Sequence, residues 1–294
     1  MATVELRKLP RRRTMVEGGR RKSRVGTVIA NTVGLIIVVV MAFPAYWMVN
    51  TAFKPPNEVL TFTPHFLPDS PTFANFTSAL RAPLFLDGLV NGLIVTTCAT
   101  LSALVVGFLG ALAVARFRFY GRRALIFVVL LVQMVPFIAL LIPLFLMLNS
   151  LQLTNTLPGV TIVYVVLVLP YTVWTLRGFI SNVPKELDEA ALVDGCSRWQ
   201  TFTKVILPLT GPGLVATSIF GFIQAWNEFI IINTLNAPEN QNLMSWLLNN
   251  QTQRQTFWGP LMAGAIVTSI PVVIFFLVIQ KNIASGLTAG AVKG

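Results

Sequence analysis

Six long apolar segments recur along this 294-residue chain, and they limit the folds open to it more than any other feature does. Each segment is close to the roughly 20 residues that a helix needs to cross the hydrocarbon core of a bilayer. Only 11% of the residues are charged and the mean hydropathy is +0.72, whereas a soluble domain carries about 25% charged residues. The sequence therefore predicts an all-α polytopic membrane protein with six transmembrane helices. These cover residues about 25–49, 89–115, 124–148, 159–176, 213–233 and 257–279.

The positions of the basic residues predict how the spans are oriented. Nineteen of the 22 Lys and Arg residues lie in residues 1–24, in the loops after the second and fourth predicted spans, and after the sixth. Only Lys54, Arg81 and Arg254 lie in the other loops. Because cytoplasmic loops carry the excess of Lys and Arg, we expect both termini in the cytosol and residues 54–87 in an external loop.

The net charge of +11 is concentrated in a predicted basic cytosolic tail, residues 1–24, that precedes one transmembrane domain, residues 25–294. A tail of this kind is usually disordered, and it can also contact anionic lipid headgroups at the cytosolic surface. The remaining basic residues punctuate loops, as membrane orientation requires. This distribution argues against a nucleic-acid partner.

No pattern of catalytic or cofactor-binding residues is present in the sequence. No Gly-Lys pair occurs, which excludes a phosphate-binding loop of the usual form, and there is no Gly-x-Ser-x-Gly motif. His65 is the only histidine, and the two cysteines, Cys98 and Cys196, have no metal-ligand spacing. We expect neither a catalytic residue nor a bound cofactor or metal in this chain.

The most polar interior segment, residues 181–210, lies between the fourth and fifth predicted spans. Asn182 is placed to cap a helix, Pro184 suits its first turn, and acidic residues follow where the helix dipole favours them. Gly195 suits a left-handed helix stop, and Ser197-Arg-Trp-Gln200 has the form of a capping box that begins a second helix. The segment therefore predicts two short cytosolic helices joined at a glycine elbow.

At 100° per residue, one face of the first short helix is largely small and apolar. It comprises Val183, Leu187, Ala190, Ala191 and Asp194. Another surface can approach such a face closely, and we expect a side chain at position 195 to clash there.

This segment resembles the Glu-Ala-Ala loop of binding-protein-dependent ABC importer permeases. That pattern falls on Glu189, Ala190, Ala191, Gly195, Val205, Leu207 and Pro208, with Val205 in place of the usual Ile. The resemblance implies a coupling helix that docks into a cleft of a cytosolic ATPase subunit. The predicted coupling residues are these seven together with Asp194.

Further stretches resemble the carbohydrate branch of these permeases, in particular the maltose/trehalose-type second transmembrane subunit. They include Arg116-Phe-Arg-Phe, Trp226-Asn-Glu-Phe229 and the terminal Gly286-Leu-Thr-Ala-Gly-Ala-Val-Lys-Gly294. The resemblance implies the type I ABC importer permease fold in the cell membrane and a role in transport rather than catalysis. It also implies a sister permease, two ATPase subunits that bind ATP and Mg²⁺, an extracellular solute-binding protein and a sugar substrate.

Four residues near the outer end of the fifth predicted span are candidates for the solute path or for the interface with the sister permease. They are Gln224, Trp226, Asn227 and Glu228. A carboxylate near membrane depth is costly and is usually functional, although Glu228 also suits a helix-to-helix hydrogen bond or the wet outer boundary. Trp226 also suits an anchor at the membrane interface.

The glycines at positions 286, 290 and 294 predict a flexible cytosolic tail, which either reaches the ATPase dimer or frays.

Two other functional classes are weighed against the ATP-driven importer. An ion-coupled secondary transporter normally needs several ionisable groups inside the membrane, and Glu228 stands almost alone. A membrane enzyme acting on lipid phosphates would be expected to show clustered Asp or His residues, and the sequence has no such cluster.

Overall fold

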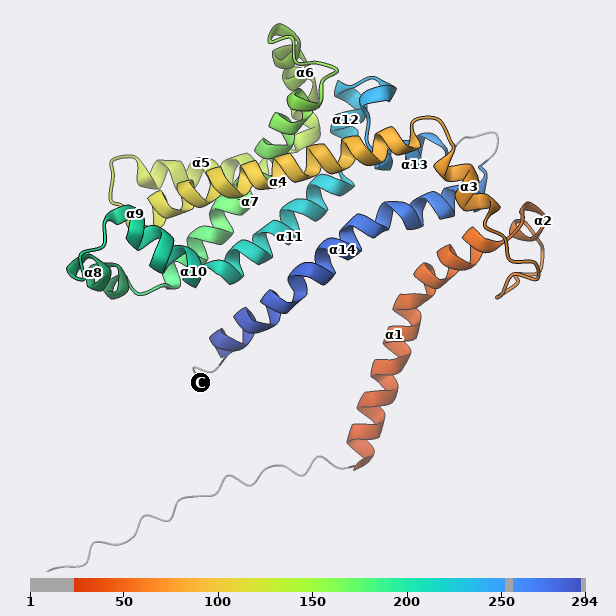
Figure 1. Cartoon of the computed structure of the whole chain (residues 1–294), viewed down its shortest axis with the longest axis horizontal. Coiled ribbons are helices and arrows are strands. Elements are labelled where there is room, and N and C mark those ends of the chain that lie inside the picture. The colour runs from red at the N-terminus through yellow and green to blue at the C-terminus, as the bar shows by residue number, and fades with distance from the viewer. Residues whose placement is uncertain (1–23, 252–255, 292–294) are drawn as a thin grey trace, which may run out of the picture. The chain divides into compact units, whose positions relative to one another are not determined.

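The computed structural model describes residues 24–251 and 256–291, and within these ranges every regular element is a helix (Figure 1). The chain divides into two compact units, Met1–Tyr46 and Trp47–Gly294. The long helices are α1 (Arg24–Phe53), α4 (Phe85–Arg116), α7 (Leu157–Asn182) and α14 (Trp258–Ala291). Each of these four has the length and apolar composition to cross a membrane. They correspond to the first, second, fourth and sixth predicted spans.

The third predicted span, residues 124–148, is broken rather than continuous. It consists of α5 (Arg122–Met134), the 3₁₀ turn η1 (Phe137–Leu140) and α6 (Leu141–Ser150), with a bend of 95° between the two parts. The break lies at Val135-Pro136, where Val135 is extended at φ −76° and ψ 123°. Proline lacks the N–H that a helix needs and disfavours helical geometry in the residue before it, which accounts for the break.

The fifth predicted span, residues 213–233, is also interrupted. Helix α11 (Gly211–Asn227) ends where Glu228 becomes extended, and α12 (Ile230–Leu235) begins two residues later. On the other side, α11 meets the arm formed by residues 198–209 at a bend of 69°. Counting each bent pair as one crossing gives up to six spans, although the second pair includes residues 198–209, which the sequence predicts to lie in the cytosol.

The predicted external loop, residues 54–87, contains the short helices α2 (Pro56–Val59) and α3 (Ala74–Leu80). The buried Asn75 amide donates to the carbonyl oxygens of Ala52 and Lys54 at 2.9 and 2.7 Å, which fixes α3 to the end of α1. The Glu58 carboxylate accepts from the backbone N–H groups of Asp69 and Ser70. The loop is therefore folded by its own hydrogen bonds.

Helices α4, α7 and α11 pack side by side around the main core, and α14 lies against α11 (Figure 1). Small residues allow this approach: a Cβ added at Gly107 of α4 would lie 2.5 Å from Cγ2 of Thr172 on α7. Close approach at small residues is the usual basis of helix packing in membranes. Two short elements, η3 (Pro238–Asn240) and α13 (Leu243–Asn249), lie in the segment between α12 and α14.

Helix α14 runs to Ala291, well beyond the predicted end of the sixth span at residue 279. The glycine-rich segment that begins at residue 286, which the sequence predicts to be flexible, is helical up to Ala291. Gly286 and Gly290 are tolerated here because a single glycine costs a helix only about 1 kcal/mol relative to alanine.

Candidate coupling site and solute path

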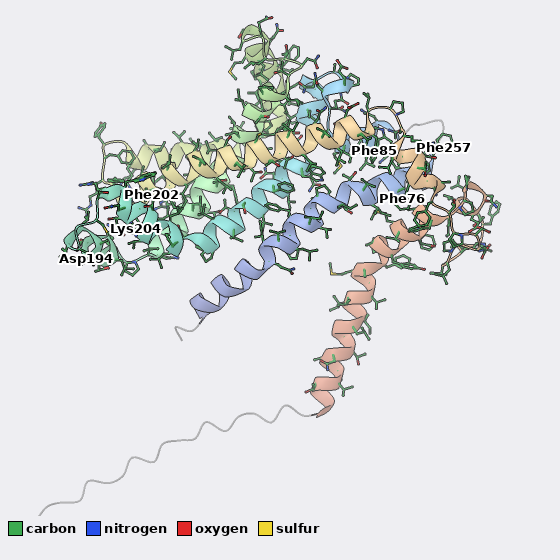
Figure 2. All side chains as sticks on the ribbon, viewed as in Figure 1. Phe76, Phe85, Asp194, Phe202, Lys204 and Phe257 are labelled. Atoms are coloured by element: carbon green, nitrogen blue, oxygen red, sulfur yellow. The ribbon has the colours of Figure 1, made fainter. Side chains whose placement is uncertain are left out.

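The polar segment between α7 and α11 forms two short helical arms joined at Gly195. The first arm is α8 (Lys185–Val193), and the second is α9 (Arg198–Thr201), the π turn η2 (Phe202–Ile206) and α10 (Leu207–Leu209). The predicted cap at Asn182 is wrong, because Asn182 ends α7 and Pro184 occupies the N-cap position of α8. Figure 2 shows Asp194, Phe202 and Lys204 together at the end of the helices where both arms lie.

Gly195 turns the chain through a left-handed conformation, with φ at +86°. The N–H of Cys196 donates to Ala191 O at 2.9 Å, and the N–H of Gly195 donates to Leu192 O at 3.1 Å. This pair of bonds is a Schellman motif, which satisfies carbonyls at the end of α8. A Cβ at position 195 would have nothing within 4 Å, so the expected clash does not occur within this chain. The requirement for glycine is conformational.

The second arm begins with the predicted capping box. Gln200 N–H donates to Ser197 Oγ at 3.2 Å, and Ser197 N–H donates to Gln200 Oε1 at 2.8 Å. Ile206 is buried in a cluster of apolar residues from α4 and α7, and Phe202 and Leu207 pack against that cluster. Among the motif positions, Leu207 therefore helps to fix the arm, Val205 is half-buried and Pro208 is exposed.

An ion pair attaches the first arm to α4. Arg116 Nε lies 3.0 Å from Asp188 Oδ2, and Arg116 Nη1 donates to Val183 O at 3.0 Å. The side chains of Arg116 and Asp188 are 7% and 20% exposed. Nη2 of Arg116 and Oδ1 of Asp188 are buried without hydrogen-bond partners, so the pair is not a bidentate fork. A hollow of about 270 Å³ between α4 and the two arms is lined by both residues.

Burial raises the pKa of the Asp188 carboxyl above its ordinary value of 3.8, and the neighbouring Glu189 acts in the same direction. The Arg116 guanidinium and Lys185 oppose this rise. Removing Asp188 from water thus has a larger effect on its pKa than its cationic neighbours have. Arg116 therefore stabilises the ionised form of Asp188 against the effect of burial.

Most of the other α8 side chains are exposed. Ala191 and Val183 are buried, whereas Leu187, Ala190 and Asp194 of the same predicted face are exposed. Glu189 is exposed, and no hydrogen bond or ion pair joins it to another described residue. The single predicted face is therefore divided between packing on the chain and presentation to the outside.

Of the candidates near the end of α11, Trp226 is only 4% exposed. Its indole Nε1 donates to Thr268 O on α14 at 3.1 Å, and its ring lies 3.4 Å from a Cβ built at Gly92 of α4. Trp226 thus packs three helices together, a position that fits neither the solute path nor an anchor at the membrane interface.

Glu228 organises the break between α11 and α12. Its Oε1 accepts from the N–H of Ile231 at 3.0 Å, while its backbone oxygen accepts from Tyr164 OH and Asn242 Nδ2 at 2.9 and 2.7 Å. These bonds satisfy groups that the break would otherwise leave unpaired. The carboxylate thus caps the start of α12, and the bonds to more distant elements are made by the backbone oxygen of Glu228.

Gln224 lines a cavity of about 370 Å³ between α5, η1, α7 and α11. Gln133 and Tyr171 line it too, and Tyr171 stacks on Phe220 with ring centroids 3.7 Å apart. Gln224 Oε1 is buried without a hydrogen-bond partner. Asn227 is exposed one helical turn beyond Gln224. Aromatic walls with a few convergent polar groups are typical of sites for small polar solutes.

Sequence reasoning missed Arg116, Asp188 and the cavity residues Gln133 and Tyr171. Asp188 lies three residues before the buried Ala191, so helical periodicity was the signal that could have placed it on the packed face. The partnership of Arg116 with α8 left no local signal, because it joins segments far apart in the chain.

Three comparisons identify what this chain is similar to. Residues 103–289 match the model of the binding-protein-dependent transport system inner membrane component family. The chain is 42% identical to the diacetylchitobiose uptake system permease protein DasC of Streptomyces coelicolor, over 93% of this chain and 100% of that protein. It is 37% identical to the trehalose transport system permease protein SugB of Mycobacterium tuberculosis, over 88% and 95%.

Among solved structures, the fold resembles a chain of a bacterial ABC transporter that imports the acidic polysaccharide alginate. The TM-score is 0.75 at 22% identity, over 90% of this chain and 98% of that chain. A chain of the MetNI methionine ABC transporter superposes with a TM-score of 0.56 at 17% identity, over 69% and 96%. Together with the family match, these likenesses confirm the all-helical permease fold. The chain belongs to the family of binding-protein-dependent transport system inner membrane components.

Proposed function

We propose that this chain is a sugar-conducting permease subunit of an ATP-driven importer, and that a cytosolic ATPase operates it through residues 184–208. It would pair with a sister permease, receive its solute from an extracellular binding protein and rest on two ATPase subunits that bind ATP and Mg²⁺. The observation that carries this proposal is the construction of the elbow. One surface of α8 is fixed to the chain, and the opposite surface is exposed.

The arrangement of the loops supports the proposed sidedness. Three predicted external segments bond to one another: Trp246 Nε1 donates to Pro83 O at 3.2 Å, and Asn155 Oδ1 accepts from Ala237 N–H at 2.8 Å. At the opposite end of α4, Arg116 contacts Val183 beside the elbow. The most basic loops and the elbow thus occupy one end of the helices, as expected for the cytosolic side.

The exposed surface of α8 suits a protein partner. Leu187, Leu192 and Val193 are 41%, 46% and 87% exposed, and Glu189 lies among them. Exposed apolar side chains beside an unpaired carboxylate are typical of a contact site rather than of a solvated loop. A partner that moved α8 would pull on α4 through Arg116 and on the core of α4 and α7 through Ile206.

The cavity beside Gln224 is the segment of the solute path that we assign to this chain. Sugars present hydroxyl groups and apolar ring faces, which match two amide side chains and a stacked aromatic pair. The residues proposed to face the solute are Gln133, Tyr171 and Gln224, with Asn227 at the end of α11. The relatives named for diacetylchitobiose and trehalose uptake favour a disaccharide-type substrate.

The test compares Glu189→Ala with Glu186→Ala in the assembled transporter. Both carboxylates are exposed on α8. If Glu189 is desolvated in an ATPase cleft, its loss is expected to weaken ATPase association by on the order of 3–5 kcal/mol. The loss of a carboxylate at the rim of the contact would cost less than about 1 kcal/mol. We expect lower sugar uptake and less co-purified ATPase for Glu189→Ala only. Normal values of both for Glu189→Ala would contradict the proposed docking.

A further inference from the structure

Four arginine side chains line one hollow between α5 and α7, close to the end of α4. The hollow has a volume of about 700 Å³, and its arginines are Arg118, Arg122, Arg123 and Arg177. Its other lining residues are Phe119, Tyr120, Gly121, Ala124 and Ile126. No carboxylate lines it, so several positive charges share one concave surface without compensation.

None of these four arginines forms an ion pair with another residue in the part of the chain that the structure describes. The Nε groups of Arg122 and Arg177 are buried and have no hydrogen-bond partner. Burying a charged donor without an acceptor is costly, and an occupant that supplied anionic oxygens would remove that cost. Guanidinium groups match phosphate oxygens particularly well, because their N–H groups bind two oxygens at once.

The surroundings of the hollow indicate the source of that phosphate. Phe127 and Val128, which follow the arginines on α5, are 61% and 52% exposed, so an apolar surface continues from the hollow along the helix. Trp174 is 42% exposed, and its ring lies 5.2 Å from the Arg177 guanidinium carbon. Exposed aromatic residues beside basic ones are typical of the boundary between headgroups and acyl chains.

We propose that this four-arginine hollow binds the phosphate of an anionic phospholipid from the cytosolic leaflet, with the acyl chains along the exposed face of α5. Arg122 and Arg177 hold the phosphate, and Arg118 and Arg123 attract it from the rim. Basic pockets between transmembrane helices are known to take such headgroups. The site is distinct from the elbow, although the segment that links them, Arg116 to Arg118, is short.

The test uses the assembled transporter in bilayer discs of phosphatidylcholine with phosphatidylglycerol, followed by mild delipidation and native mass spectrometry. We expect the unsubstituted transporter to retain phosphatidylglycerol on this subunit. The double variant Arg122→Gln/Arg177→Gln should retain it less, by roughly tenfold for each guanidinium removed, because bonds to charged groups are strong. Arg122→Lys/Arg177→Lys keeps the charges and should recover part of the retention.

A control variant separates a built site from general attraction. Arg81→Gln removes one positive charge from the predicted external loop, and it should retain phosphatidylglycerol like the unsubstituted protein. Equal retention by the Arg122→Gln/Arg177→Gln variant would overturn the proposal, provided that its melting temperature in phosphatidylcholine is unchanged.

Competition with inorganic phosphate identifies the source of the anion. If the lipid is the ligand, millimolar phosphate should leave most of the bound phosphatidylglycerol in place. Displacement by phosphate together with phosphate binding in pure phosphatidylcholine would overturn the lipid assignment. Loss of the ATPase from the double variant with unchanged lipid retention would overturn it too, in favour of a protein contact.

Discussion

Arg116 Nε on α4 lies 3.0 Å from Asp188 Oδ2 on α8, so the first arm of the elbow is attached to a transmembrane helix that is not its neighbour in the chain. A displacement of α8 is thereby transmitted to α4 as well as along the backbone into α7. The pair also stabilises a carboxylate whose burial alone disfavours its ionised form. The ion pair therefore attaches the elbow to the helical core.

Replacing Arg116 with Gln removes this attachment and leaves the Asp188 carboxylate without its cation. The expected loss of stability lies between the roughly 1 kcal/mol of an exposed pair and the roughly 3–5 kcal/mol of a fully buried one, because Asp188 is one-fifth exposed. Thermal unfolding and uptake by the assembled transporter measure it. Arg198→Gln is the matched control, since Arg198 lines the same hollow without an ion pair. Equal effects of the two substitutions would argue against a special role for Arg116.

The pH dependence of the Arg116→Gln variant follows from the raised pKa of Asp188. A carboxyl whose pKa is higher in the folded state binds its proton more tightly there, so folding stability decreases as pH rises from 3.8 through the folded pKa. Without Arg116 the pKa of Asp188 rises further, so the stability defect of Arg116→Gln should lessen as pH falls through that raised pKa. Unfolding measured as a function of pH tests this.

The double variant Arg116→Gln/Asp188→Asn provides the control for that pH series. Replacing both charged groups by neutral ones should restore much of the stability at neutral pH. It should also remove the part of the pH dependence of stability that comes from Asp188. A defect of Arg116→Gln that did not vary with pH, or a double variant as unstable as the single one, would contradict the assigned electrostatics.

Substitutions of Gly195 should follow its backbone conformation. At φ +86°, alanine is expected to cost roughly 1–2 kcal/mol, and asparagine less, because asparagine tolerates the left-handed region. Uptake should therefore fall more for Gly195→Ala than for Gly195→Asn. If asparagine were the more harmful of the two, the limit at this position would be the size of the side chain against a docked partner.

Glu228→Ala should weaken the start of α12 without changing the affinity for sugar. The carboxylate accepts the Ile231 N–H, and the loss of such a cap costs about 1 kcal/mol. Glu228→Gln retains an oxygen acceptor and should behave almost like the original residue. Unfolding and the sugar concentration at half-maximal uptake are the measurements. A glutamine variant as defective as alanine, with altered sugar affinity, would instead place Glu228 in the solute path.

Gln224→Leu removes a polar group from the cavity beside Tyr171 at nearly constant volume. Because one hydrogen bond contributes about 1 kcal/mol, the sugar concentration for half-maximal uptake should rise roughly fivefold. Ser218→Ala on the same helix is the control, since the Ser218 hydroxyl bonds to its own helix at Val215 O. Equal sugar dependence in the two variants would remove Gln224 from the path.

The elbow could be predicted because its signals are local. Gly195 and the Ser197–Gln200 capping box each specify backbone geometry within a few residues, and both are found. The break at Pro136 also carried a local signal, but hydropathy alone does not register it. The break at Glu228 depends on Tyr164 and Asn242, which are distant in the chain, so no local sequence pattern predicts it. Trp226 was misplaced for the same reason, since its partner Thr268 lies on another helix.

The central claim, that an ATPase acts on this chain through the exposed surface of α8, is tested most directly by site-specific photo-crosslinking. A photoreactive residue at Ala190 should form a crosslink to the ATPase subunit in the assembled transporter, with a yield that changes when ATP is bound. The same residue at Phe62, in the predicted external loop, should form none. A crosslink from Ala190 to the extracellular binding protein, or labelling of position 190 by an impermeant reagent added outside intact cells, would contradict the account.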